Sequence, residues 1–399
     1  SFRWCIMLSA YLFIQFFVGI VVGFLIACSP TKFGKNQEAN NICDSSVVNC
    51  IVENESIMVT QSFKVGAGKV DILFINDNSA SMSKNQINMA NRFSGFIQNL
   101  DKKNIDYRIA IATTDFSLIS ASSDHLISFE NGQKFITMAE GNRVDLFNKS
   151  IVRNETVSCE DLIIAMFNTY GISFQSNSFY KEQYKIKCPS PDTRGIHVGN
   201  IIISENSHEF MRSDANLNII LISNDNVRQG KEMEDRDKAS TFIEMMQNKI
   251  PNKNWSFNSI VVKDEACKQM QTLRNAKNQI VMNQQGMAIL GGIGIEYINL
   301  SNSVTTDIDN NPRPRGQVLD ICQNDYTQNF TSISTQISDE ARIFTMKCTP
   351  SESPTIFVSE TKDSSVAIPH TWNGNKIIFE KGSEGLDVMI NYKCYTGPT

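Results

Sequence analysis

Short apolar runs that alternate with amphipathic stretches from Phe63 onward are the feature that most constrains the fold of this chain. Four runs have the length and composition of buried strands, at residues 72–75, 107–112, 217–222 and 257–262. Apolar residues at helical spacing predict helices over residues 85–100 and 161–170, and a third from Lys231 to Lys249, stopped by Pro251. Strands that alternate with helices predict an α/β fold, with a doubly wound, mostly parallel sheet flanked by helices.

The first predicted strand runs directly into residues 77–81, Asp-Asn-Ser-Ala-Ser, which precede the first predicted helix. The pattern Asp-x-Ser-x-Ser places a carboxylate, Asp77, and two hydroxyls, Ser79 and Ser81, around one point. These are hard oxygen ligands that suit Mg²⁺ or Mn²⁺, with Ca²⁺ as an alternative. In open α/β sheets, ligands bind beyond the carboxyl ends of the strands, so we predict that function lies at this edge.

The chain begins with a long apolar segment, residues 4–27, which contains no charged residue and follows Arg3. About 20 apolar residues suffice to span a bilayer. The segment ends in Leu-Ile-Ala-Cys, which resembles the lipobox of bacterial lipoproteins, and this resemblance implies a signal peptide over residues 1–27 and lipidation of Cys28. A permanent N-terminal helix anchor is the alternative. Both interpretations predict an exported protein.

Cysteine usage independently predicts export. Eight cysteines remain outside the apolar segment: Cys43, Cys50, Cys159, Cys188, Cys267, Cys322, Cys348 and Cys394. The number is even and no Cys-x-x-Cys pair occurs, which favours four disulfides over a zinc or redox motif. Disulfides persist in oxidising compartments. The simplest expectation is that the eight cysteines pair sequentially along the chain.

Composition and charge restrict the partners and the domain organisation. The formal net charge is −5 and no Lys/Arg stripe occurs, so nucleic acid is not expected as a partner. Residues 28–62 are polar and are interpreted as a tether. Near the C-terminus, short apolar runs and the turn Asn373-Gly374 predict a small β module over residues 349–399, held by Cys348 and Cys394.

The Asp-x-Ser-x-Ser loop resembles the metal-ion-dependent adhesion site of von Willebrand factor type A domains. Residues 107–115, 212–223 and 320–325 extend the resemblance over residues 63–348, to the variety of this domain found in bacterial lipoproteins. In that family the aspartate and both serines of the loop bind the metal. A threonine on a second loop adds a hydroxyl, and an aspartate after a later strand supports the site through water.

The resemblance assigns the remaining site positions as follows. Thr156 takes the place of the threonine, with Ser158 as the alternative, and Asn224 aligns with the usual aspartate, followed one residue later by Asp225. Because divalent-cation affinity depends on ligand charge, Asn224 lowers the expected affinity, although an amide oxygen still orients a bound water. The resemblance therefore implies a weakened site, and a metal-free relic is the alternative.

These observations predict a lipid-anchored protein of the bacterial cell envelope, at the outer membrane, facing the periplasm or the exterior. Its expected function is adhesion or interaction through a divalent metal, to which a protein or surface ligand offers a carboxylate. A structural or assembly envelope lipoprotein with a metal-free site is the alternative. The four histidines form no His-x-x-x-His pair and no Gly-x-Ser-x-Gly elbow occurs, so we do not expect an enzyme. Residues 291–294, Gly-Gly-Ile-Gly, lack the Lys-Ser/Thr of a phosphate loop and are interpreted as a turn.

Overall fold

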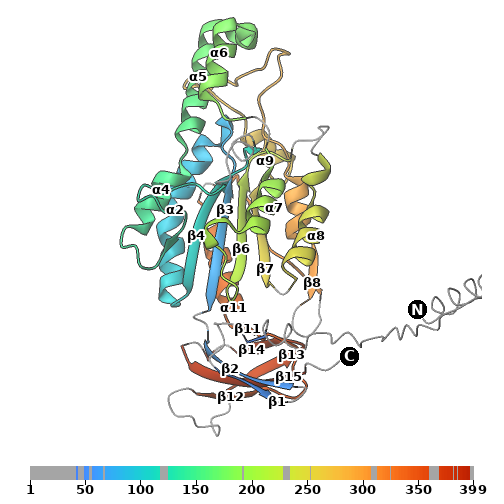
Figure 1. Cartoon of the computed structure of the whole chain (residues 1–399). Coiled ribbons are helices and arrows are strands. Elements are labelled where there is room, and N and C mark those ends of the chain that lie inside the picture. Colours follow the sequence, from blue (N-terminus) through green and yellow to red (C-terminus); the bar gives the residue numbers. More distant parts are fainter. Residues whose placement is uncertain are drawn as a thin grey trace, which may run out of the picture.

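The computed structural model describes residues 42–43, 49–53, 56–65, 68–116, 125–190, 193–227, 234–251, 253–306, 312–323, 325–358, 368–380, 382–383 and 385–395. The predicted signal peptide, Cys28 and most of the predicted tether lie outside these residues. Within the described ranges, no helix is both long enough and apolar enough to cross a membrane. Figure 1 shows that the chain forms a larger α/β part and a smaller β module beneath it.

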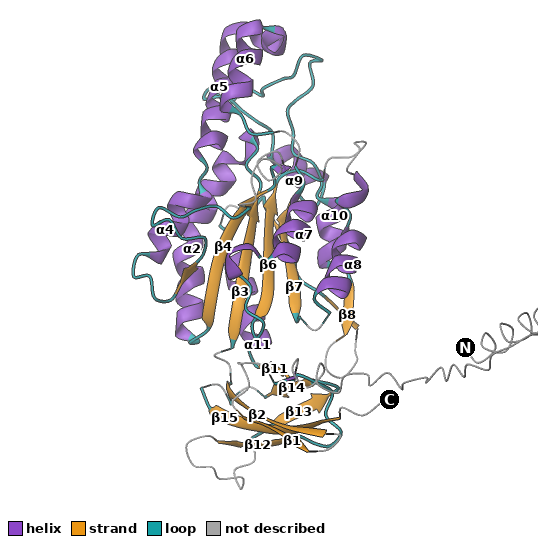
Figure 2. Cartoon of the chain, in the orientation of Figure 1, coloured by secondary structure: helices purple, strands orange, loops and turns teal. Residues whose placement is uncertain are grey.

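A six-stranded sheet forms the centre of the α/β part (Figure 2). Its strands are β3 (Lys69–Asn76), β4 (Asp106–Thr113), β5 (Ile136–Thr137), β6 (Asn216–Ser223), β7 (Trp255–Val261) and β10 (Val318–Asp320). Their order is β10-β7-β6-β3-β4-β5, and all neighbours pair in parallel except β5, which is antiparallel to β4. Counted along the chain, this is the order 3-2-1-4-5-6 of doubly wound sheets. The predicted fold class is confirmed.

Helices cover both faces of the sheet (Figure 1). One face carries α2 (Ser83–Lys102), α4 (Arg143–Ile151) and α11 (Thr327–Glu340), and the other carries α7 (Gly195–Glu205), α8 (Ala239–Lys249) and α10 (Ile295–Ser301). Ile72 and Phe74 of β3 pack against the first set, whereas Leu73 and Ile75 pack against the second. Because successive side chains of a strand point to opposite faces and both faces are covered here, residues 72–75 of β3 are all apolar.

Further elements lie beyond the sheet and at its margins. They are α5 (Asn154–Tyr170), α6 (Ser178–Lys187) and α9 (Glu265–Met270), the 3-10 helices η1 (Ala80–Met82), η2 (Gly171–Ser176), η3 (Ser207–Glu209) and η4 (Glu234–Arg236), and the antiparallel pair β8 (Val304–Thr306) and β9 (Pro312–Pro314). The helix predicted from Lys231 begins at Ala239 in the structure; residues 228–233 lie outside the described ranges.

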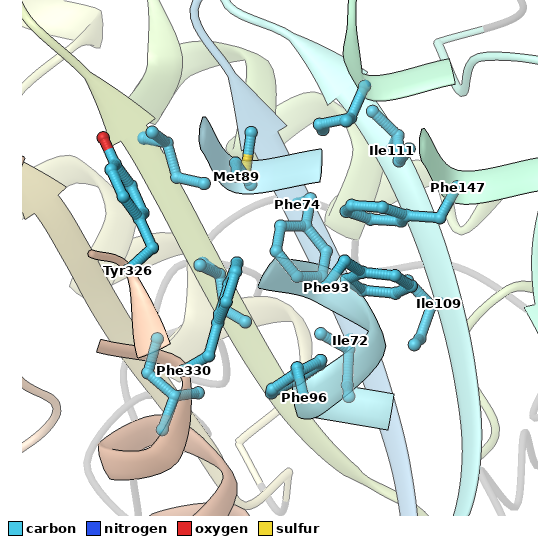
Figure 3. Close-up of a cluster of buried hydrophobic side chains, with 14 of the residues drawn as sticks. Ile72, Phe74, Met89, Phe93, Phe96, Ile109, Ile111, Phe147, Tyr326 and Phe330 are labelled. Carbon is cyan, nitrogen blue, oxygen red and sulfur yellow. The ribbon is translucent and has the colours of Figure 1, made fainter. Parts of the chain in front are cut away.

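Phe74 occupies the centre of the larger core cluster (Figure 3). Its ring meets Phe93 and Phe96 of α2, Phe147 of α4 and Phe330 of α11 edge-on, with centroids 4.9–6.5 Å apart. Such contacts add to the free energy gained from burying each ring. The cluster fixes the three helices of this face to the strand that leads into residues 77–81.

The β module contains two antiparallel sheets. The first has the order β1 (Asn49–Glu53), β2 (Ser56–Lys64), β15 (Asp387–Tyr395) and β12 (Thr355–Val358), and the second has the order β11 (Ile343–Thr345), β14 (Lys376–Phe379) and β13 (His370–Asn373). The structure therefore differs from the expected boundaries, because residues 49–64 belong to the module and not to a tether. The reason is that Ile57 and Val59 of β2 are fully buried against β15, while Ser56, Met58 and Thr60 beside them are partly exposed, as in a half-buried strand.

The sequential pairing of the eight cysteines is confirmed. The disulfides are Cys43–Cys50, Cys159–Cys188, Cys267–Cys322 and Cys348–Cys394. Their Cα–Cα distances of 4.7–5.9 Å lie within the range of native bridges. The second bridge ties α5 to the residue after α6, the third ties α9 to the turn after β10, and the fourth closes the β module.

Candidate metal-binding site

The segments that follow β3 and β6 meet at the carboxyl edge of the sheet. These two strands are neighbours, and the chain leaves them toward opposite faces, with α2 on one side and α8 on the other. Such a switch point is where doubly wound sheets bind their ligands. The backbone N–H of Asp77 donates to the carbonyl of Ile222 at 2.9 Å, which holds the two segments together.

Asp77 is a fully buried carboxylate with no cationic partner among the described residues. One carboxylate oxygen, Oδ1, accepts the backbone N–H of Ser79 at 2.8 Å, and the other, Oδ2, accepts the hydroxyl of Ser223 at 2.6 Å. Burial raises the pKa of Asp77 above its usual value, and the hydrogen bonds from Ser223 and Ser79 lower it by less. Since buried charges are normally paired or bound to metal, a cation at this position would compensate the ionised carboxylate.

Three further oxygens beside Asp77 have the spacing of metal ligands. The hydroxyl oxygens of Ser79 and Ser81 are 3.5 Å apart, and the Ser81 hydroxyl donates to Oδ1 of Asn224 at 3.2 Å. Adjacent ligands around an octahedral Mg²⁺, with bonds of about 2.1 Å, are separated by about 3 Å. A slight contraction therefore brings these oxygens onto one hard cation, and the residues present fit the implied metal.

Thr156 reaches the loop, but its hydroxyl is already engaged. It is fully buried, donates to the carbonyl of Asn78 at 2.7 Å, and accepts a hydrogen bond from Gln86 at 3.3 Å. The alternative, Ser158, is exposed on α5. Thr156 is therefore the hydroxyl that the fold brings to the loop, and it must turn away from Asn78 to ligate a cation.

Asp225, the carboxylate one position after Asn224, is exposed. Its Oδ1 accepts the backbone N–H of Asn226 at 2.8 Å and lies over Gly292. This hydrogen bond joins Asp225 to its own turn, while Asp77, Ser79, Ser81 and Asn224 form one connected cluster.

Two contributors to the site were missed by the sequence analysis. Gln271, at the end of α9, places its Oε1 at 3.4 Å from Nδ2 of Asn224 and at 2.9 Å from Nδ2 of Asn85. Since the amide nitrogen of Asn224 faces Gln271, its oxygen faces Ser81. No local pattern marks Gln271, because it reaches the site only through the fold.

The second missed contributor is the pair Gly291-Gly292, which sequence analysis interpreted as a turn. Gly292 N–H donates to the carbonyl of Asn224 at 2.9 Å. A Cβ at Gly291 would lie 2.3 Å from that carbonyl oxygen, and a Cβ at Gly292 would lie 2.2 Å from the carboxylate of Asp225. Only glycine permits this approach of two backbones at position 291, whereas the Asp225 side chain could move away from a Cβ at position 292, so Gly291 fixes the position of the loop after β6.

A cavity of about 320 Å³ opens beside Ser81. Its lining includes the charged residues Lys84, Glu160 and Arg274 as well as Gln271. Burial raises the pKa of Glu160, which a hydrogen bond from Ser83 partly offsets. The cavity offers a ligand polar and basic contacts next to the candidate metal position.

A second group of potential ligands, Cys267, Asp320 and Cys322, is not a metal site. Their ligand atoms lie within 4.8 Å of one another because the two sulfurs form a disulfide. Neither sulfur is available as a thiolate, and Asp320 Oδ1 accepts the backbone N–H of Cys322 at 2.8 Å.

The strand order defines the larger part of the chain as a doubly wound α/β domain, with a loop of oxygen-bearing side chains at its switch point and an attached β module. No protein-family description matches the chain, and no curated protein matches it.

Among solved structures, the chain is similar to the pilus adhesin SpaC from Lactobacillus rhamnosus GG in its open conformation, at 8% identity over 86% of this chain and 41% of that chain, with a TM-score of 0.37. It is similar to proximal thread matrix protein 1 from the mussel byssus, at 12% identity over 70% and 47%, with a TM-score of 0.31. It is also similar to manganese-loaded Plasmodium vivax TRAP, at 12% identity over 71% and 78%, with a TM-score of 0.32. The chain spans less than half the length of the first two proteins, and at these TM-scores the similarities carry no functional argument.

Proposed function

We propose that this chain is an exported adhesion or interaction module that binds a carboxylate-bearing protein or surface ligand through a divalent metal. Asp77, Ser79, Ser81 and Asn224 would hold Mg²⁺ or Mn²⁺, with Thr156 as a further hydroxyl. The observation that carries the proposal is the buried Asp77 carboxylate, which lacks a cationic partner among the described residues and lies beside three suitably spaced oxygens. When bound, the metal supplies an electrostatic site for the partner's carboxylate.

We propose binding and not catalysis for this site. The Ser79 hydroxyl interacts with that of Ser81, the Ser81 hydroxyl donates to Asn224, and within the described ranges no histidine bonds to either serine. His197 bonds through its backbone to Asp237, and His125 pairs with Glu205. A serine–histidine nucleophile would require a histidine within hydrogen-bond reach of the serine, and these contacts do not supply one.

The four disulfides support placing the protein outside the cytoplasm. We further propose a lipid anchor at Cys28 and a place in the cell envelope, at the outer membrane; the lipobox-like sequence is the feature that favours the anchor. A structural or assembly role with a metal-free site is a second candidate. Asn224 favours it, because the site then holds one carboxylate where the family has two.

Metal-dependent retention on a carboxylate surface tests the proposed function. The full chain should bind an immobilised glutamate-rich peptide in Mn²⁺ and be released by EDTA, as measured by surface plasmon resonance. Ser81→Ala removes one ligand and should weaken retention about tenfold, since each lost ligand lowers cation affinity. Ser94→Ala on α2, outside the cluster, is the matched control and should bind as the wild type does. Equal retention in Mn²⁺ and EDTA would contradict the proposal.

Asn224→Asp should raise the affinity for Mn²⁺ about tenfold, because a second carboxylate adds ligand charge. The gain is limited by repulsion from Gln271 Oε1 and the Ser81 carbonyl, each 3.4 Å from the present amide nitrogen. Titration calorimetry with Mn²⁺ measures the change. Asn88→Asp adds the same charge in the neighbouring cavity, and it controls for the long-range electrostatic effect of one more negative charge. Equal effects of the two substitutions would show that residue 224 is not a ligand.

A further inference from the structure

A cavity of about 570 Å³ lies between the α/β part and the β module. It is lined by the C-terminal half of α11, by β14, and by Arg313, Arg342 and Ile343. Figure 1 shows β11 and β14 directly beneath α11. Glu340 of this lining hydrogen-bonds to Ser256 near the start of β7, so the cavity is at the amino edge of the sheet, opposite Asp77. Its volume is typical of small-molecule sites, which favour junctions of this kind.

Two cations, Arg313 and Lys376, line this cavity, and the buried carboxyl of Glu340 is the acidic group of the lining whose charge acts on both. In the described part of the chain, the Nε of Arg313 is buried and has no hydrogen-bond partner, and no hydrogen bond or ion pair holds the amine of Lys376. Burial and the charges of Arg313 and Arg315 lower the pKa of Lys376 below its usual value. Partly buried like charges raise the free energy of the folded state, and an anion between them would lower it.

The other charged residues of the lining are already engaged. Arg342 donates to Oδ1 of Asp339 at 3.1 Å and to the carbonyl of Phe379 at 2.7 Å. Glu340 accepts hydrogen bonds from Gln336 at 3.0 Å and from Ser256 at 3.1 Å, and burial raises its pKa. Three cations and two carboxylates line the cavity, which leaves one net positive charge even when both acids are ionised.

We propose that this cavity binds a small organic anion whose carboxylate or phosphate group bridges Arg313 and Lys376. The guanidinium fork of Arg313 matches the oxygens of either group, and the amine of Lys376 adds a point charge. Ile343 and Ile378 provide apolar contacts for the body of the ligand. The site is separate from the candidate metal site and does not depend on the proposed function.

Thermal unfolding of the full chain with three probes tests the proposal. Phenyl phosphate or benzoate should raise the melting temperature, and benzyl alcohol, their uncharged match, should not. A larger rise with phenyl phosphate identifies a phosphate ester as the ligand class, and a larger rise with benzoate identifies a carboxylic acid. Absence of a rise with both anions, or an equal rise with benzyl alcohol, would overturn the proposal.

Substitutions locate the response in this cavity. Lys376→Met should lose the response to the anions, because it removes one of the two cations that would bridge the bound group. Arg313→Gln should also lose the response. Lys181→Met, at an exposed position of α6, is the matched control and should respond as the wild type does. Asp77→Asn, which alters the candidate metal site, should show the same rise in melting temperature with the anions as the wild type. A response that persists in both cavity variants would refute the assignment.

Discussion

Asp77→Asn should abolish the stabilisation by Mg²⁺ or Mn²⁺ and, in the presence of a chelator, should stabilise the folded protein at neutral pH. A metal at about 100 times its dissociation constant stabilises the native state by about 2.7 kcal/mol, which the variant should lose. The gain without metal arises because a fully buried, uncompensated charge is removed. The new amide is accommodated since the Ser223 hydroxyl is also 3.0 Å from the carbonyl of Asp225, to which it can donate instead.

The pH dependence of the same experiment follows from the raised pKa of Asp77. The stability contributed by its protonated carboxyl is fully present below the unfolded value of 3.8 and is lost as pH rises through the higher folded value. Metal requires the ionised carboxylate, so the response to metal grows over the same interval. Asp71, Glu160 and Glu340 also have pKa values raised by burial. Because these groups also titrate, the contribution of Asp77 is obtained by measuring stability against pH in the wild type and in Asp77→Asn by calorimetry and taking the difference.

Asp71→Asn is the matched control for this experiment. Asp71 is equally buried on the same strand, but it pairs with Arg212 at 2.9 Å. Its substitution should destabilise the protein, because it leaves Arg212 without its buried partner, and should preserve the response to metal. If Asp77→Asn kept the metal response, the site would lie elsewhere.

Phe74→Ala should lower the free energy of unfolding by about 3–5 kcal/mol, the usual cost of removing a buried aromatic ring. The ring is fully buried and contacts four phenylalanines from three helices, so the space left cannot be filled without moving several elements (Figure 3). Urea unfolding at equilibrium measures the loss. Phe179→Ala, at a position 56% exposed on α6, should change stability by no more than about 0.5 kcal/mol. A loss below about 1 kcal/mol for Phe74→Ala would indicate that the core repacks around the missing ring.

The parts of the fold that the sequence predicts correctly are those encoded locally. The continuous apolar run of β3 indicates a strand covered on both faces, and the spacing of Asp77, Ser79 and Ser81 indicates the loop that follows it. Tertiary packing decides the rest. The pairing of β2 with β15 joins residues 323 positions apart, as between Lys64 and Asp387, and the alternation of β2 is obscured because Met58 is partly exposed and Gln61 is buried.

The same distinction applies to the candidate site. The contacts of Gln271 and Gly291 with Asn224 arise only when a distant segment folds over the exit of β6. The hydrogen bond that engages Thr156 with the Asn78 carbonyl likewise has no counterpart in the local sequence. The sequence Gly-Gly-Ile-Gly at residues 291–294 does indicate a close approach between backbones, but it does not reveal which segment is approached.

The β module combines strands that precede the α/β part with strands that follow it, and this affects the order in which the chain folds during synthesis. β2 precedes the whole α/β part in the chain, whereas β15, its partner over nine residues, follows it. As the ribosome synthesises the chain from its N-terminus, one edge of β2 stays unpaired until β15 has been made. The α/β part has all its strands earlier and can fold first, whereas the module closes by long-range pairing, which is intrinsically slow. During that interval the exposed edge of β2 is the part of the nascent chain most open to pairing with a wrong strand.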